Sequence, residues 1–255
     1  MRKNIKGTFF VISDHLRFPE VVEPLRYLVS KGHEIASHTH KHYYPFSLQK
    51  PEVIQEEIIV SKKLLEDKFG VPVNGFRAPG YDINSYMIDI LEQNGFIYDT
   101  SIMPSVLTPL IVLASRYKSG WTTNSLFHFS HTFAPRDIYY PSKKAVTRKS
   151  SENRSLVEIP ISVFNKSRFP FYPTFLNTIG MVGLSKMLQW IKNLDLFNFE
   201  MHTIDFISFA DVEKISSLSR HPGIHFPYKV KRAYYDWIVQ ELSNSFEWAS
   251  LIVTA

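Results

Sequence analysis

The stretch HEIASHTHKH (residues 33–42) decides the fold, because it joins a short apolar run to a cluster of histidines. The run HEIAS has the length and composition of a buried strand. His38 and His42 follow at a spacing of four, which on a helical turn places both side chains on one face, whereas His40 is expected to face away into solvent. Imidazole is a common zinc ligand, so the pair predicts a metal site at the carboxyl end of a strand. Three surface histidines in a polar loop are the alternative, since the pair lacks the general-base Glu of an HExxH motif.

Short β-rich runs alternate with helical patterns through the first hundred residues, which predicts βα units around a parallel sheet or barrel. A chain of 255 residues fits one such α/β domain over residues 1–255, interrupted by an irregular insertion at about 103–155 with a hairpin near RDIYYP. The expected strands are 7–12, 33–37, 74–79, 96–102, 156–163, 196–202 and 247–253. The expected helices are 19–31, 51–69, one that Asn84 caps, one near 179–193 and one near 228–243.

The composition excludes several classes of protein. The chain contains no cysteine, which rules out disulfides, thiolate zinc sites and cysteine nucleophiles, so any metal must use His and carboxylate ligands. The formal charge of +5 is scattered and forms no basic stripe with stacking aromatics, so no nucleic-acid partner is expected. The apolar runs near the start and at 106–114 are too short for a signal peptide or a membrane span, which predicts a cytoplasmic chain as given.

Three further segments place reactive residues at the ends of predicted strands. FRAPGY (76–81) offers Arg77, which suits a carboxylate, and Gly80, which permits close backbone approach to a ligand. Asp99 lies at the same end of the next strand, and His202 lies in FEMHTID (199–205). Each also has an ordinary interpretation: Arg77 as a surface ion pair, Asp99 as a turn or cap residue, and His202 as a buried, hydrogen-bonded histidine.

Taken together and in order, these motifs resemble those of the polysaccharide deacetylase family, the carbohydrate esterases with a NodB-homology domain. The resemblance covers most of the chain. The segments that carry it are TFFVI (8–12), HTHKH (38–42), RAPGY (77–81), YDTSIMP (98–104) and FEMHTID (199–205). It implies a distorted (β/α) barrel and metal-assisted hydrolysis of an N-acetyl or related acyl group on an amino-sugar glycan.

The resemblance also implies roles for individual residues. His38 and His42 would bind a divalent metal, most simply Zn²⁺, while the Thr39 hydroxyl supports their loop. Gly80, with Tyr81 beside it, would hold the tetrahedral oxyanion.

The remaining roles concern proton transfer. His202 would protonate the leaving amine as general acid, and Asp99 would orient it and keep it charged. The role that the resemblance implies for Arg77 is to orient the catalytic base. A role for Asp205 stays open.

One departure from the family pattern concerns its first motif, which carries two adjacent aspartates on a strand ahead of TFFVI: one is a metal ligand and the other the base. The sequence contains no such pair, so we expect a chain that is incomplete at its N-terminus and lacks the first barrel strand. A shortened copy and a protein repurposed without catalysis are alternatives. Asp14 just after TFFVI is a substitute ligand in principle, although a solvated loop aspartate is the preferred interpretation.

Two other functions remain open. The FRAPGY variant also resembles enzymes of the same superfamily that hydrolyse cyclic ureides, which would make the protein a small-molecule amidase. A non-catalytic barrel that binds glycan through an aromatic cleft is the alternative from another class. The aromatic residues considered for that cleft are Tyr81, Trp121, Tyr139, Tyr140 and Phe171, for which ordinary packing is the preferred interpretation.

Overall fold

The computed structural model describes residues 5–106, 129–164, 167–171, 183, 185–212 and 222–255. By its internal contacts the chain divides into two compact units, and each is described by itself. The first unit comprises Met1–Pro104, Asn124–Pro160 and Trp248–Ala255, and the second comprises Ser105–Thr123 and Ile161–Glu247. A single domain over the whole chain therefore stays a prediction. Within the described ranges, no helix combines the length and apolar character that a membrane crossing needs.

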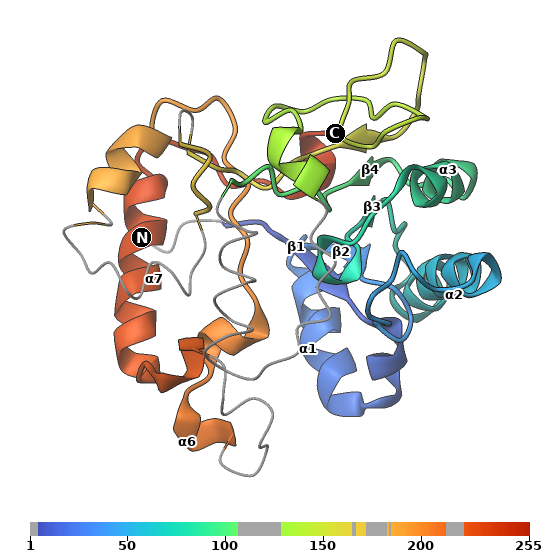
Figure 1. The fold of residues 1–255 in the computed structure, drawn as a ribbon. Coiled ribbons are helices and arrows are strands. Elements are labelled where there is room, and N and C mark those ends of the chain that lie inside the picture. The colour runs from blue at the N-terminus through green and yellow to red at the C-terminus, as the bar shows by residue number, and fades with distance from the viewer. Residues whose placement is uncertain (1–4, 107–128, 165–166, 172–182, 184, 213–221) are drawn as a thin grey trace. The chain divides into compact units, whose positions relative to one another are not determined.

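The first unit is built on a parallel sheet of five strands, which confirms the predicted α/β class. The strands lie side by side in the order of the chain, as in a (β/α) barrel, whereas a doubly wound sheet reverses direction at a switch point. Figure 1 labels the first four. The strands are β1 (Thr8–Val11), β2 (Glu34–Ser37), β3 (Gly75–Phe76), β4 (Tyr98–Asp99) and β5 (Val157–Glu158).

Three helices of this unit follow β1, β2 and β3: α1 (Pro19–Ser30), α2 (Pro51–Phe69) and α3 (Ser85–Gln93). The bounds of α2 match the predicted range 51–69. Its apolar stripe is buried at Ile54, Ile58 and Leu65, and Gly70 ends it in the left-handed conformation with φ 66°. The predicted cap of α3 is confirmed, because the Asn84 side chain accepts a hydrogen bond from the backbone N–H of Met87 at 3.1 Å.

The other described elements are short, with the exception of α7 (Tyr228–Leu242), which lies within the predicted range 228–243. Residues 185–191 are helical and fall inside the predicted helix 179–193, part of which lies outside the described residues. The remaining elements are η1 (Ser13–Arg17), η2 (Pro79–Tyr81), η3 (Phe129–Phe133), η4 (Thr203–Phe206), α6 (Phe209–Val212), η6 (Pro222–His225) and η7 (Leu251–Val253).

The predicted strand 196–202 is wrong, because this segment forms no strand. The backbone N–H of Asn198 donates to the hydroxyl of Ser162 at 2.8 Å, although the N–H of Ser162 does bond the carbonyl oxygen of Asn198. A serine side chain that takes a backbone donor competes with a β-ladder.

The predicted strand 247–253 is also wrong, since its end forms the 3₁₀ helix η7. Here the N–H of Leu251 donates to Thr8 Oγ1 and that of Ile252 to Glu34 Oε2. Side-chain oxygens again replace backbone partners. The insertion shows part of the expected hairpin, because Pro141 and Lys149 form an isolated antiparallel bridge.

Candidate active site

Parallel strands bring their carboxyl ends to one edge of the sheet, and three predicted site segments follow β2, β3 and β4 there. His38 and His42 follow β2, Arg77 begins the segment after β3, and Asp99 ends β4. Their meeting point is therefore set by the topology of the first unit. His202 belongs to the second unit.

The rings of His38 and His42 lie against each other, with centroids 4.8 Å apart and an interplanar angle of 65°. Nδ1 of His38 is 2.7 Å from the carbonyl oxygen of Arg77. A carbonyl oxygen only accepts hydrogen bonds, so Nδ1 carries a proton, and in the neutral ring Nε2 keeps its lone pair. This arrangement, in which a backbone carbonyl fixes the tautomer of a ligating imidazole, is typical of metal sites.

The loop between the two histidines is not the helical turn that their spacing suggested. Thr39 and His42 adopt left-handed conformations with φ of 64° and 58°, so the rings meet through a tight loop. The Thr39 hydroxyl accepts the backbone N–H of His42 at 3.1 Å, which is the support expected of this residue. Such strained backbone persists only where neighbouring groups hold it.

Glu57 on α2 is one of these groups, and sequence reasoning missed it. Its Oε2 accepts the N–H groups of His40 at 3.0 Å and Lys41 at 2.7 Å, and the side chain is buried. The signal was present in the sequence, because this glutamate lies on the apolar stripe of α2 beside Ile58. A charged residue on a buried helix face needs a polar partner.

Two imidazoles fit part of the tetrahedral shell that zinc prefers. Among the residues that the structure describes, no group of three or more His, Cys, Asp or Glu side chains is placed to hold a metal ion. The metal donors that the described residues bring together here are therefore His38 and His42.

Arg77 is buried and is not a surface ion pair. Its Nε donates to the carbonyl oxygen of Thr100 at 3.0 Å and its Nη2 to the Thr100 hydroxyl at 3.1 Å. The guanidinium also lies 4.2 Å from the ring centroid of Phe10 on β1, a favourable cation–π contact. The side chain thus ties β1, β3 and the segment after β4 together.

Gly80 and Tyr81 form the tight turn η2 with left-handed φ values of 60° and 61°. A Cβ on Gly80 would lie 2.1 Å from Cε2 of Tyr44, which follows the histidine loop. Only glycine allows this close approach, so the turn after β3 packs directly against the segment after β2. The N–H of Ala78, just before the turn, donates to the Ser101 hydroxyl at 2.8 Å.

Asp99 is fully buried beside Ser101 and Glu158. Its Oδ1 accepts the Ser101 hydroxyl at 2.6 Å and its Oδ2 the Ser101 N–H at 3.2 Å. Burial raises the pKa of Asp99, although its hydrogen bonds with Glu158 and Ser101 oppose the shift. Sequence reasoning missed Glu158; the available signal was a glutamate inside the apolar run LVEIPI.

His202 precedes η4 in the second unit, and its backbone N–H donates to Oδ2 of Asp205 at 2.7 Å. Asp205 is therefore a helix-capping residue, and burial raises its pKa. The ring Nε2 of His202 lies 3.4 Å from Oε1 of Glu200, a buried carboxyl that the sequence reasoning did not single out. Because Asp99 and His202 belong to different units, orientation of one by the other stays a prediction.

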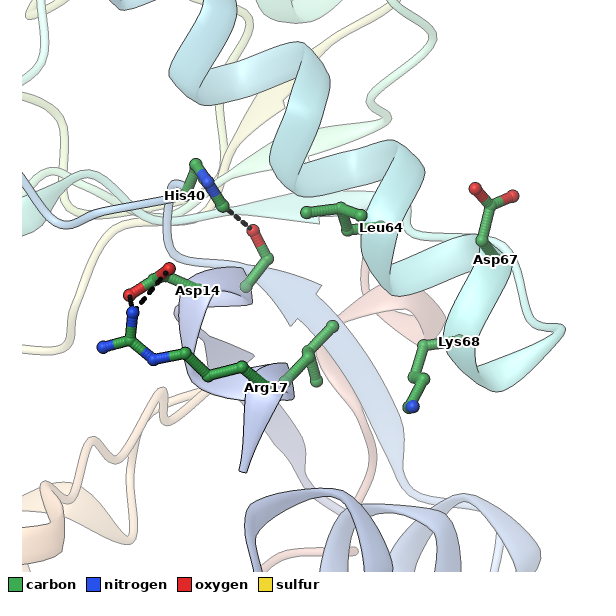
Figure 2. Close-up of a pocket in the computed structure, with 8 residues that line it drawn as sticks. Asp14, Arg17, His40, Leu64, Asp67 and Lys68 are labelled. Carbon is green, nitrogen blue, oxygen red and sulfur yellow. Dashed lines mark hydrogen bonds and ion pairs between the residues drawn. The ribbon is translucent and has the colours of Figure 1, made fainter. Parts of the chain in front are cut away.

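His40 differs from the expectation of a solvated side chain, because it is half-buried and its Nδ1 lies 2.9 Å from Oγ of buried Ser13. Both residues line an open pocket between η1 and α2, where Figure 2 shows His40. Asp14 lines the same pocket and forms an ion pair with Arg17 at 3.1 Å. His40 is thus a structural neighbour of the histidine pair, and Asp14 has a partner of its own.

The aromatic cleft of the glycan-binding alternative finds little support. Tyr139 and Phe171 are each 3% exposed, which agrees with ordinary packing. Tyr140 is exposed and Tyr81 is half-buried, whereas Trp121 lies outside the described residues.

Comparison with known proteins supplies the context for this geometry. Residues 1–98 match the family model "Polysaccharide deacetylase". A peptidoglycan deacetylase of Helicobacter pylori is 25% identical over 79% of this chain and 61% of its own length. A peptidoglycan deacetylase-like protein of Gibberella zeae is 32% identical over 68% of this chain and 46% of its own. Chitin deacetylase 1 of Cryptococcus neoformans is 34% identical over 48% of this chain and 22% of its own. The chain thus spans less than two thirds of each relative.

Proposed function

We propose, from the match of residues 1–98 to the polysaccharide deacetylase family, that this protein hydrolyses the N-acetyl groups of an amino-sugar glycan. The relatives named as peptidoglycan and chitin deacetylases support this substrate class. The observation that carries the proposal is the histidine pair after β2, with Nδ1 of His38 bound to the Arg77 carbonyl. An imidazole held in this tautomer presents Nε2 to a metal ion.

In this proposal His38 and His42 hold a divalent cation, with Zn²⁺ as the preferred ion for imidazole ligands. When bound, such a cation polarises an amide carbonyl and lowers the pKa of a bound water. The chain's own part is to present both rings at one point, which it achieves through the Thr39 hydroxyl and the Glu57 carboxylate.

The other roles belong to residues after β3 and in the second unit. We assign the N–H of Gly80 to the oxyanion of the tetrahedral intermediate, with Tyr81 beside the substrate, because the left-handed turn brings its backbone close to Tyr44, which follows the histidine loop. Arg77 holds this turn against Thr100. His202 protonates the leaving amine, and Glu200 is the carboxylate next to its ring. We assign no general base, since the sequence has no adjacent aspartate pair.

The test is release of acetate from N-acetylglucosamine oligomers by the purified chain, with and without added Zn²⁺. We expect zinc-dependent release that His38→Ala abolishes and that His202→Ala lowers by about 10²–10⁴-fold. His15→Ala is the matched control, because His15 is exposed on η1, and it should keep the activity. Turnover of a cyclic ureide without acetate release would favour the small-molecule amidase. Glycan binding that survives chelation, with no hydrolysis of either substrate, would favour the non-catalytic barrel.

A further inference from the structure

Asp99 and Glu158, called here the carboxyl pair, place two acidic groups side by side inside the first unit. β4 and β5 are parallel neighbours that pair these two residues in register, so both side chains leave the sheet on the same face. Both residues are fully buried. Two ionised carboxylates in such a position would repel each other and would both lose their hydration.

The hydrogen-bond donors around the pair leave one oxygen without a donor. Asp99 accepts the hydroxyl and the N–H of Ser101. Oε1 of Glu158 accepts the N–H of Ile102 at 3.0 Å, whereas its Oε2 is buried and has no donor among the described residues. An ionised carboxylate only accepts, but a protonated one carries an O–H donor. If Glu158 is protonated, its Oε2 can therefore act as a donor, and the neighbouring Asp99 is the acceptor.

The charges that face the carboxyl pair favour one bound proton between the two acids. Arg77 is the cation close to both carboxyls, and its charge favours their ionised forms. Tyr139 is the other titratable neighbour, but its hydroxyl donates to the carbonyl oxygen of Val146 at 2.7 Å. Burial, followed by the charge of Asp99, raises the pKa of Glu158 well above its usual value. One positive charge against two acidic groups balances one ionised carboxylate.

We propose that Asp99 and Glu158 share a single proton, and that residue 158 acts as a neutral hydrogen-bond donor which positions Asp99. The effect reaches the candidate site through Ser101, whose hydroxyl donates to Asp99 and accepts the N–H of Ala78. Ala78 immediately precedes the turn that contains Gly80. Glu158 is thus a positioning residue for the turn after β3. The shared proton is independent of the proposed function, whereas any effect of Glu158 on activity rests on that function.

Glu158→Gln tests the proposal, because glutamine reproduces the protonated acid: its oxygen accepts from Ile102 and its amide donates to Asp99. Glu158→Ala removes both bonds. The measurement is the free energy of unfolding in urea from about pH 5 to about pH 9. A carboxyl whose folded-state pKa is raised keeps a proton that the unfolded chain releases, so wild-type stability falls as the pH rises toward that folded pKa.

We therefore expect the stability of Glu158→Gln relative to wild type to increase with pH, and Glu158→Ala to be the least stable of the three at low pH. Glu56→Gln, an exposed change on α2, is the control and should differ from wild type by a constant amount. A constant difference for Glu158→Gln, or a stability as low as that of Glu158→Ala, would overturn the proposal.

Infrared spectroscopy gives an independent readout. The folded wild type should show the carbonyl band of a protonated carboxyl at neutral pH, and Glu158→Gln should lose it, whereas Glu56→Gln should keep it. A wild-type spectrum without this band would contradict the shared proton. Neither measurement needs acetate release, so failure here and failure of the proposed function are distinguishable.

Discussion

The carbonyl oxygen of Arg77 lies 2.7 Å from Nδ1 of His38, so the segment after β3 fixes the tautomer of a histidine after β2. The guanidinium of the same Arg77 donates to Thr100 after β4. One residue therefore links three neighbouring strand ends, through its backbone on one side and its side chain on the other. Replacement of the Arg77 side chain would remove the bonds to Thr100 but keep the backbone carbonyl. The tautomer of His38 and the bonds to Thr100 can therefore be tested separately.

Replacement of His42 by Ala should abolish zinc binding at the histidine pair, because a single imidazole then remains of the two whose rings touch. Isothermal titration with Zn²⁺ measures this directly and does not depend on catalysis. His40→Ala is the matched control. It removes the bond to Ser13, which costs about 1 kcal/mol of stability, but should keep zinc affinity. Equal zinc affinity in the His42→Ala and wild-type proteins would remove His42 from the site.

Glu57→Ala should destabilise the loop between the two histidines, because the N–H groups of His40 and Lys41 lose their acceptor. We expect a loss of about 1–3 kcal/mol in the free energy of unfolding and a zinc affinity lower by about 10–100-fold. Glu56→Ala, one residue earlier on the exposed face of α2, is the control. Should zinc affinity stay unchanged while stability falls, Glu57 would support the fold without shaping the pair.

Local patterns in the sequence predicted the elements whose stability is local. The sequence predicts α2 at 51–69, because neighbouring residues alone supply its apolar stripe and the Gly70 that ends it. The parallel order of the first four strands followed from their alternation with helices. The strand predictions for 196–202 and 247–253 were wrong because backbone N–H groups of these segments bond side chains far away in the sequence. These side chains are Ser162, Thr8 and Glu34.

In the candidate site, too, local features were predictable from the sequence and tertiary contacts were not. The spacing of His38 and His42 predicted that their rings meet, but the left-handed conformations of Thr39 and His42 depend on the packing of α2 and are not visible in a spacing. The buried acids Glu57 and Glu158 were visible only as charges in apolar runs. Their partners are set by tertiary contacts, so their roles needed the structure.

Gly80→Ala should destabilise the turn after β3 for two separable reasons. An alanine at φ 60° costs about 1 kcal/mol, and its Cβ would also lie 2.1 Å from the ring of Tyr44. Gly70→Ala is the matched control, because Gly70 has φ 66° and a Cβ added there meets nothing within 4 Å. Urea unfolding should show a clearly larger loss for Gly80→Ala, and Tyr44→Ala in the same protein should recover part of the difference. Equal losses at the two glycines would show that the Tyr44 ring yields freely.

Glu200→Gln should lower acetate release, because it removes the carboxylate that lies 3.4 Å from Nε2 of His202, the ring that we propose protonates the leaving amine. His202→Ala should lower the rate by about 10²–10⁴-fold, the usual range for a general acid. Glu200→Gln should fall between this variant and wild type. Glu241→Gln on α7, whose carboxylate contacts Lys192, is the control and should leave the rate unchanged. A rate identical to wild type in Glu200→Gln would show that Glu200 does not assist His202.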